Sequence, residues 1–182
     1  MRTARISRST VEIIVIAYCN SALHTGGMTG NRYEFRNHWS VDAAPDSAYT
    51  VLEALDRYPR WWPEVREVRQ ISDQAYELRC RSLLPYDLVF VTHESKRDPV
   101  NRVLEARLSG DLEGFSRWTI TPAAGGGADL LFEEEVVTTK ALLRRLAPIA
   151  RPAFRANHAL MMRHGERGLR TYLAGFEHGT GP

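Results

Sequence analysis

The last quarter of the chain repeats apolar residues with the period of an α-helix. At 100° per residue, six positions fall within a sector of roughly 80°: they are Phe154, His158, Met161, Gly165, Leu169 and Tyr172. Charged residues occupy the opposite side, at Arg155, Arg163, Glu166 and Arg170. The pattern predicts a long amphipathic helix that packs one narrow stripe against another layer of the fold. Pro148 and Pro152 disfavour helix just before it, so we expect 141–151 to form a kinked or separate lead-in.

The preceding part of the chain instead alternates with period two, which is typical of half-buried strands. Seven such segments are expected, at 33–41, 65–71, 75–84, 87–97, 102–110, 114–121 and 129–139. Between the first two, Pro45 and Asp46 open a predicted helix at 44–55, and two prolines confine 57–63 to a turn or a second short helix. These elements predict an α+β fold, a curved seven-stranded antiparallel sheet wrapped around the long C-terminal helix.

We expect the folded domain to span 31–176, with tails at 1–30 and 177–182. Within residues 1–27, three arginines precede a short apolar run that Glu12 interrupts. Gly26 and Gly27 end this segment. This pattern favours a tail outside the fold, with Met28 as a second candidate start. An atypical signal or anchor and an added strand or helix remain the alternatives.

Composition narrows the function classes. The chain has 182 residues, 43% of them hydrophobic, and a formal net charge of +2, so bulk charge gives no argument for a nucleic-acid partner. No apolar run approaches the roughly 20 residues of a membrane span. Cys19 and Cys80 form neither a disulfide framework nor a metal-ligand spacing, which favours a cytoplasmic protein with Cys80 in the core. No cofactor fingerprint is present, and a homodimer stays open.

Several segments, in this order, resemble a known superfamily. They are VDAAP at 41–45, YPRWWPEV at 58–65, GFSRWTI at 114–120, ADLLF at 128–132, and the helical stretch 157–169. Together they are similar to the START-like, birch-pollen-allergen-like (SRPBCC) superfamily, in particular its polyketide cyclase/dehydrase and lipid-transport branch. The resemblance covers about 31–174 and implies a helix-grip fold with a cavity between sheet and helix that holds an apolar or aromatic ligand. Carriers, cyclases, allergens and accessory proteins share this fold, so fold alone does not settle function.

Candidate ligand contacts are the apolar and polar residues that face the helix stripe, together with the stripe itself. They are Trp39, Trp62, Phe90, Thr92, Trp118, Phe132, Phe154, His158 and Met161. Rigid aromatic walls suit a ligand cavity. The alternative is that the aromatic residues fill a core, and that His158 is a hydrogen-bonded core histidine.

Three residues are candidates for acid–base chemistry. Glu94 and Glu134 fall in the inner phase of their strands, where an unpaired carboxylate is costly, and His158 lies on the stripe. The alternative is that both glutamates lie in water near strand ends, past a bulge. The resemblance implies a cavity arginine in aromatic cyclases, but Glu94 stands at the matching strand position, and Arg79 and Arg81 are predicted to face outward.

Three functions follow from these observations. The first is binding or transport of a lipophilic or aromatic small molecule. The second is a polyketide cyclase or dehydratase that uses Glu94, Glu134 and His158 for proton transfer. The third is an accessory protein acting through its surface, for which an arginine cluster at Arg144, Arg145, Arg151 and Arg155 is the best support; the alternative for that cluster is an ordinary solvated face.

Overall fold

The structure is a computed structural model that describes residues 32–82, 86–139 and 141–177, with backbone alone for 141–151, 176 and 177. Its elements are β1 (Arg32–Val41), α2 (Pro45–Glu53), the 3-10 turn η1 (Leu55–Arg57), α3 (Tyr58–Trp61), β2 (Val65–Ser72), β3 (Ala75–Cys80), β4 (Leu88–Asp98), β5 (Val103–Gly110), β6 (Leu112–Pro122), β7 (Ala128–Thr138) and α4 (Ala141–Glu177). The predicted tail at 1–30 lies outside the described residues, as does 178–182 of the tail predicted at 177–182, whereas Glu177 is the last residue of α4.

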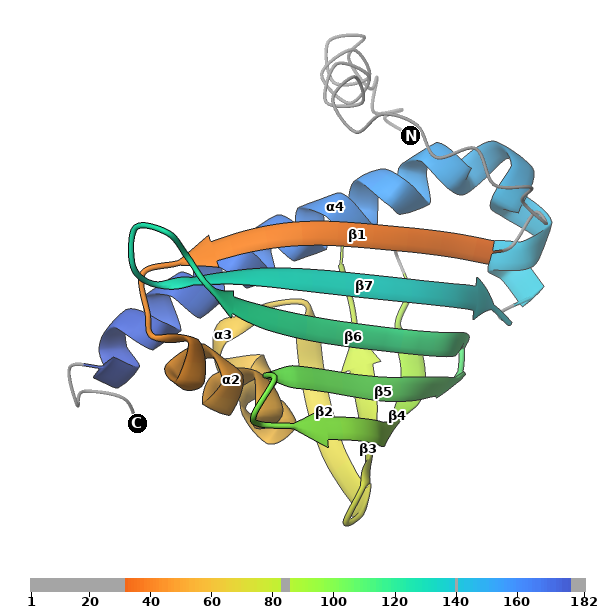
Figure 1. Ribbon diagram of the computed structural model, residues 1–182. Coiled ribbons are helices and arrows are strands. Elements are labelled where there is room, and N and C mark those ends of the chain that lie inside the picture. The colour runs from red at the N-terminus through yellow and green to blue at the C-terminus, as the bar shows by residue number, and fades with distance from the viewer. Residues whose placement is uncertain (1–31, 83–85, 140, 178–182) are drawn as a thin grey trace, which may run out of the picture.

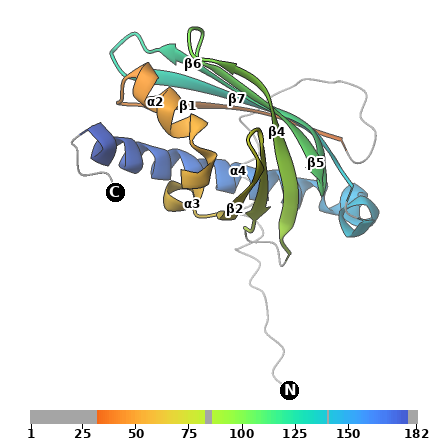
Figure 2. The same ribbon diagram turned by 90° about the horizontal axis from the view of Figure 1, so that it is seen from below.

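The strands form one antiparallel sheet in the order β1-β7-β6-β5-β4-β3-β2. Figures 1 and 2 show the sheet curving around α4, which runs along its concave side, with α2 and α3 beside the C-terminal part of that helix. This is the predicted α+β helix-grip architecture, and the sequence-based fold prediction is confirmed.

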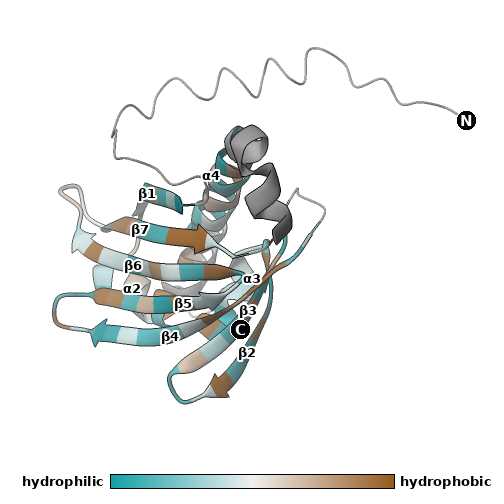
Figure 3. Ribbon diagram, turned by 90° about the vertical axis from the view of Figure 1, so that its right-hand side faces the viewer, coloured by the Kyte–Doolittle hydropathy of each residue, from teal (hydrophilic) through white to brown (hydrophobic). Residues whose placement is uncertain are grey.

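The sheet separates an apolar inner face from a charged outer face, as the alternation predicted, and the strands appear banded by hydropathy in Figure 3. Outer charges pair across neighbouring strands. Arg117 Nη2 lies 2.6 Å from a Glu105 oxygen, and Arg69 Nη2 lies 2.8 Å from a Glu77 oxygen. The Arg69–Glu77 pair is exposed and the Arg117–Glu105 pair is partly exposed, and such pairs contribute only a few tenths of a kcal/mol each.

Two glycines let α4 approach α3 closely. A Cβ on Gly168 would overlap the carbonyl oxygen of Trp61, and one on Gly165 would lie 2.7 Å from the Trp62 ring. The Trp62 indole N–H donates to the Met161 carbonyl at 3.1 Å. The segment 58–65 is therefore held against α4 by backbone contact as well as by its aromatic side chains.

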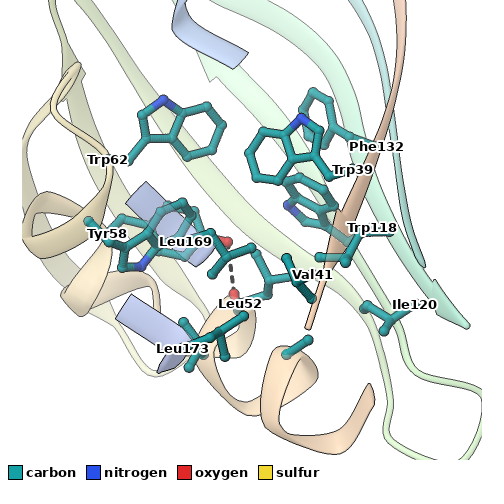
Figure 4. Packing of buried hydrophobic residues seen from close by; sticks show 14 of the residues in the cluster. Trp39, Val41, Leu52, Tyr58, Trp62, Trp118, Ile120, Phe132, Leu169 and Leu173 are labelled. Atoms are coloured by element: carbon teal, nitrogen blue, oxygen red, sulfur yellow. Dashed lines mark hydrogen bonds between the residues drawn. The ribbon is translucent and has the colours of Figure 1, made fainter. Parts of the chain in front are cut away.

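A dense apolar cluster fills the space around this contact (Figure 4). The rings of Trp39 and Trp118 lie 4.8 Å apart, and Trp118 lies 4.7 Å from Phe132. Residues that are almost fully buried complete the cluster: Leu52, Ile120, Leu130, Leu169 and Leu173. The Tyr58 hydroxyl donates to the Leu52 carbonyl at 2.8 Å, and the side chain of Trp118 also bonds to that hydroxyl. We call this region the packed half of the interior.

Two element boundaries differ from the sequence-based expectation. Of the two alternatives for 141–151, a separate element is wrong, because 141–177 form one helix. The first turns of that helix run in a different direction from the rest in Figures 1 and 2, as the kinked alternative predicts. Pro148 and Pro152 are four residues apart on one side of the helix, so the hydrogen bonds they remove lie together and the remaining ones continue the helix. Strand β3 ends at Cys80 rather than at residue 84, and 83–85 lie outside the described residues.

A candidate ligand-binding cavity

A cavity of about 190 Å³ lies between the sheet and the part of α4 that begins near Phe154. Its walls are mainly aromatic and aliphatic: Phe35, Phe90, Phe132, Phe154, Trp62, Leu78, Leu88, Leu108, Val136, Met161 and Met162. Polar side chains line a smaller share: Tyr33, Tyr86, Thr92, Ser116, Glu134, Thr138, Asn157 and His158. We call this region the hollow half of the interior, in contrast to the packed half.

Strand register brings the polar side of the cavity together. Phe35 of β1 pairs with Glu134 of β7, which pairs in turn with Ser116 of β6. In an antiparallel sheet, residues directly opposite one another point to the same face, so these three side chains form one inward-facing row. Glu134 therefore stands between an aromatic ring and a hydroxyl.

The long helix adds a histidine to this row. His158 Nε2 lies 3.3 Å from Glu134 Oε2, and the imidazole stacks on Phe35 with ring centroids 3.6 Å apart and an interplanar angle of 11°. The two side chains are 17% and 12% exposed, respectively. A carboxylate in such a place is costly unless charge or hydrogen bonds compensate it, and His158 supplies one partner. This His158–Glu134 pair is the chemically distinctive feature of the cavity.

The other titratable groups in the wall are held neutral. Burial, and to a smaller extent the nearby carboxylates of Glu134 and Glu64, raise the pKa of the Cys80 thiol to about 12. Burial, and then the neighbouring phenol of Tyr33, raise the pKa of Tyr86 to about 12. Near neutral pH these residues act as uncharged walls, and Cys80 is not a thiolate nucleophile.

Most of the predicted ligand contacts line the cavity. The lining includes Trp62, Phe90, Thr92, Phe132, Phe154, His158 and Met161, together with the candidate Glu134. The Thr92 hydroxyl is already used, since it donates to the Tyr76 carbonyl at 3.3 Å. No bound ligand tests these contacts, so their role remains a prediction.

Trp39, Trp118 and Glu94 lie elsewhere, which corrects where the sequence pattern placed them. Trp39 and Trp118 have the expected inward phase but belong to the packed half. Glu94 is exposed, and its carboxylate bonds to Arg97 at 2.7–2.9 Å beside the β4 bulge. Glu94 keeps the inner phase, since it still pairs with Ala106, but the register shift that follows it and the contact with Arg97 leave its carboxylate at the surface.

A second histidine–carboxylate pair was not anticipated from the sequence. His164 Nδ1 lies 2.6 Å from Glu64 Oε1, and Glu64 is 7% exposed. The pair joins the start of β2 to α4 outside the cavity lining. Glu64 sits in the PRWWPEV stretch, whose prolines and tryptophans were interpretable from sequence, but no spacing links it to a histidine 100 residues later.

Other candidate sites gain no support from the part of the chain that the structure describes. Within those residues no group of three or more His, Cys, Asp or Glu side chains is arranged to hold a metal ion. None of the described helices is long and apolar enough to cross a membrane. Of the arginine cluster, Arg155 is exposed, whereas the side chains of Arg144, Arg145 and Arg151 lie outside the described residues.

Comparisons with known proteins identify the family and the fold. The model of the family described as polyketide cyclase / dehydrase and lipid transport matches residues 32–174. No curated protein sequence matches the chain. Among solved structures, the Zhui aromatase/cyclase from Streptomyces sp. R1128 is similar with a TM-score of 0.68 and 15% identity, covering 79% of this chain and 94% of that one.

Two further structures share the fold. A START superfamily protein from Mycobacterium smegmatis has a TM-score of 0.62 and 14% identity, covering 80% of this chain and 99% of that one. The di-domain ARO/CYC StfQ from the steffimycin biosynthetic pathway has a TM-score of 0.63 and 15% identity, covering 81% of this chain and 53% of that one. At these identities the similarity shows the fold alone.

Proposed function

Because the chain belongs to the polyketide cyclase / dehydrase and lipid transport family, we propose that it binds a lipophilic or aromatic small molecule in the cavity between the sheet and α4. The observation that carries this proposal is an interior hollow of about 190 Å³ with aromatic walls and one partly buried polar pair, His158–Glu134. Ligand pockets combine apolar walls with a few convergent polar groups in this way.

The size of the cavity limits the ligand. An apolar cavity of about 150 Å³ is enough to bind benzene, so a hollow of about 190 Å³ suits one ring or two fused rings. Burying a bicyclic hydrocarbon against these walls gains stabilisation at roughly 25 cal/mol per Å² of apolar surface removed from water. We therefore expect ligands of naphthalene size to bind with 1:1 stoichiometry.

The test is equilibrium dialysis with 2-methylnaphthalene, an apolar probe of suitable size. The wild type is expected to bind it saturably. Ser116→Phe should abolish binding, because the added ring fills the cavity beside Glu134, whereas Thr119→Phe, on the opposite face of the same strand, should retain it. Absence of saturable binding by the wild type, or equal binding by both variants, refutes the proposal. Native mass spectrometry of the purified protein is a second experiment, which would identify a co-purifying ligand.

A second candidate function is favoured by the His158–Glu134 pair itself. Two titratable groups at 3.3 Å inside an apolar cavity are suited to general acid–base catalysis, and a cyclase or dehydratase step requires such proton transfer. The two functions differ in the effect of His158→Ala. For a binder, affinity falls by the roughly 1–3 kcal/mol of one buried hydrogen bond. For an enzyme, turnover of the co-purified ligand falls by about 10²–10⁴-fold while its affinity stays close to that of the wild type.

A further inference from the structure

The lining of the cavity contains few charged residues. Of the described residues that line it, none is a lysine or an arginine, and Glu134 is the one carboxylate. Its partner His158 carries a charge only when protonated. The described lining is therefore neutral when His158 is protonated and negative when it is not. In neither state does it offer a net positive charge to an anion.

The hydrogen-bonding capacity of Glu134 is only partly used by the protein. An ionised carboxylate accepts hydrogen bonds at about four positions. The described residues place a single polar partner at Glu134, His158 Nε2 near Oε2, and none at Oε1. Of its two neighbours in the row, Phe35 has no donor and Ser116 has one hydroxyl. A partly buried carboxylate in this state is stabilised by a donor that comes from the ligand.

A hydroxyl group fits this position better than an ammonium group. If His158 is neutral and its Nε2–H points to Glu134, its other ring nitrogen is also an acceptor, so the pair presents acceptors to the cavity. If His158 is protonated, a cationic ligand would meet an imidazolium already in contact with the same carboxylate. A neutral donor is compatible with both protonation states, whereas a cation is repelled in one of them.

From this geometry we propose that the ligand is an uncharged one- or two-ring compound with a phenolic or alcoholic hydroxyl that donates to Glu134, and that the site rejects a carboxylate of the same shape. The inference rests on the proposed function, since it specifies the ligand class of the same cavity. It gives Glu134 the role of a specificity-determining residue. His158 then positions the carboxylate while stacking on Phe35.

Four probes that share a naphthalene ring test the inference by equilibrium dialysis at pH 7. They are 2-naphthol, 2-methylnaphthalene, 2-naphthoate and 2-naphthylmethylamine. We expect 2-naphthol to bind about tenfold to a hundredfold more tightly than 2-methylnaphthalene, the factor expected for one hydrogen bond to a charged acceptor. The carboxylate should bind more weakly than the methyl compound. Tightest binding by the carboxylate or the amine overturns the inference, as does equal binding of the naphthol and the methyl compound.

Matched variants locate the effect. Glu134→Gln keeps the size of the side chain but removes its charge, so the preference for 2-naphthol should shrink to a few-fold and 2-naphthoate should gain affinity. Glu133→Gln, one residue away on the outer face, should leave the order of the four probes unchanged. An unchanged preference in folded Glu134→Gln contradicts the inference, and the wild-type ranking decides the matter if that variant does not fold.

The outcomes also separate this inference from the proposed function. If the four probes bind saturably but with equal affinity, the cavity binds ring compounds and the role of Glu134 is refuted. If none of them binds, the proposed function fails, and the inference fails with it.

Discussion

The two halves of the space between α4 and the sheet are built from the same strands and the same helix, yet one is packed and the other hollow. On β7, Leu130 faces the packed half and is 1% exposed, whereas Glu134 and Val136 line the cavity. On α4, Leu169 is fully buried, whereas Met161 lines the cavity. The difference arises from α2 and α3, which cover only the C-terminal part of the helix (Figure 2).

This contrast shows how the fold divides stability from binding. The tryptophans of β1, α3 and β6 fill the covered half, where close packing contributes most of the stabilisation. The other half is not covered by helices comparable to α2 and α3, so the His158–Glu134 pair can remain there on the same inner face. A ligand site can vary in such a region while the packed half keeps the domain folded.

A matched pair of leucines offers the strongest test of the contrast. Leu130→Ala, in the packed half, should lower the free energy of unfolding by about 4–5 kcal/mol, because it creates a new cavity. Leu108→Ala, in the wall of the existing cavity, should cost about 2–3 kcal/mol, since the atoms removed have fewer contacts to lose. Urea denaturation of both variants measures the difference. Equal losses of stability would indicate that Leu108 is packed as closely as Leu130, and the contrast between the two halves would be wrong.

The contact between α3 and α4 should be nearly as sensitive. Gly168→Ala gains helix propensity, but its methyl group would overlap the Trp61 carbonyl, so the helix has to move away. We expect a net loss of about 3 kcal/mol. Thr171→Ala, at an exposed position one turn later, is the control and should change stability by less than about 0.5 kcal/mol. Thermal unfolding of both variants checks the prediction. A Gly168→Ala protein as stable as the wild type would contradict it.

Much of this architecture was predictable because it depends on local pattern. Period-two alternation gave the seven strands, and the stripe from Phe154 to Tyr172 gave the helix. The inner phase also placed Phe132 and Glu134 on the correct face. Local pattern cannot distinguish the two halves, since Trp118 and Ser116 share one phase on β6 but lie in the packed half and in the cavity wall.

The candidate site was less predictable because its contacts are long-range. Glu94 and Glu134 have the same phase and lie in one cross-strand row through Ser116 and Ala106. A bulge and Arg97 bring one to the surface, while α4 covers the other. Which histidine meets which carboxylate depends on the docking of the helix, which no spacing in the sequence encodes.

The two histidines of α4 are expected to have separate effects, one on stability and the other on ligand binding. His164→Ala should lower stability by about 1–3 kcal/mol, since it leaves the buried carboxylate of Glu64 without its partner, and it should not change the affinity for 2-naphthol. His158→Ala should lower that affinity about tenfold, with a smaller effect on stability. Denaturation and dialysis on both variants measure this. If His164→Ala weakened binding as much as His158→Ala, the separation of the halves would be wrong.

Cys80 belongs to the core cluster and also lines the cavity, and its effect on stability should appear only at alkaline pH. Burial raises the pKa of its thiol to about 12, so the folded chain keeps a proton that the unfolded chain releases above about pH 9. Unfolding then releases a proton, and stability falls as pH rises from about 9 towards 12, by up to about 1.4 kcal/mol per pH unit from this group. Cys80→Ala should show a shallower decline in alkaline urea titrations. Identical slopes would show that the thiol ionises normally in the folded state.

The most direct test of the contrast is a methyl-resolved NMR titration of the wild-type protein with 2-naphthol. We expect saturable shifts at Met161, Leu108 and Val136, which line the cavity, and no comparable shifts at Ile120, Leu130 and Leu173, which fill the packed half. Saturable shifts concentrated on the second group, or spread equally over both, would contradict a hollow half that binds and a packed half that stabilises.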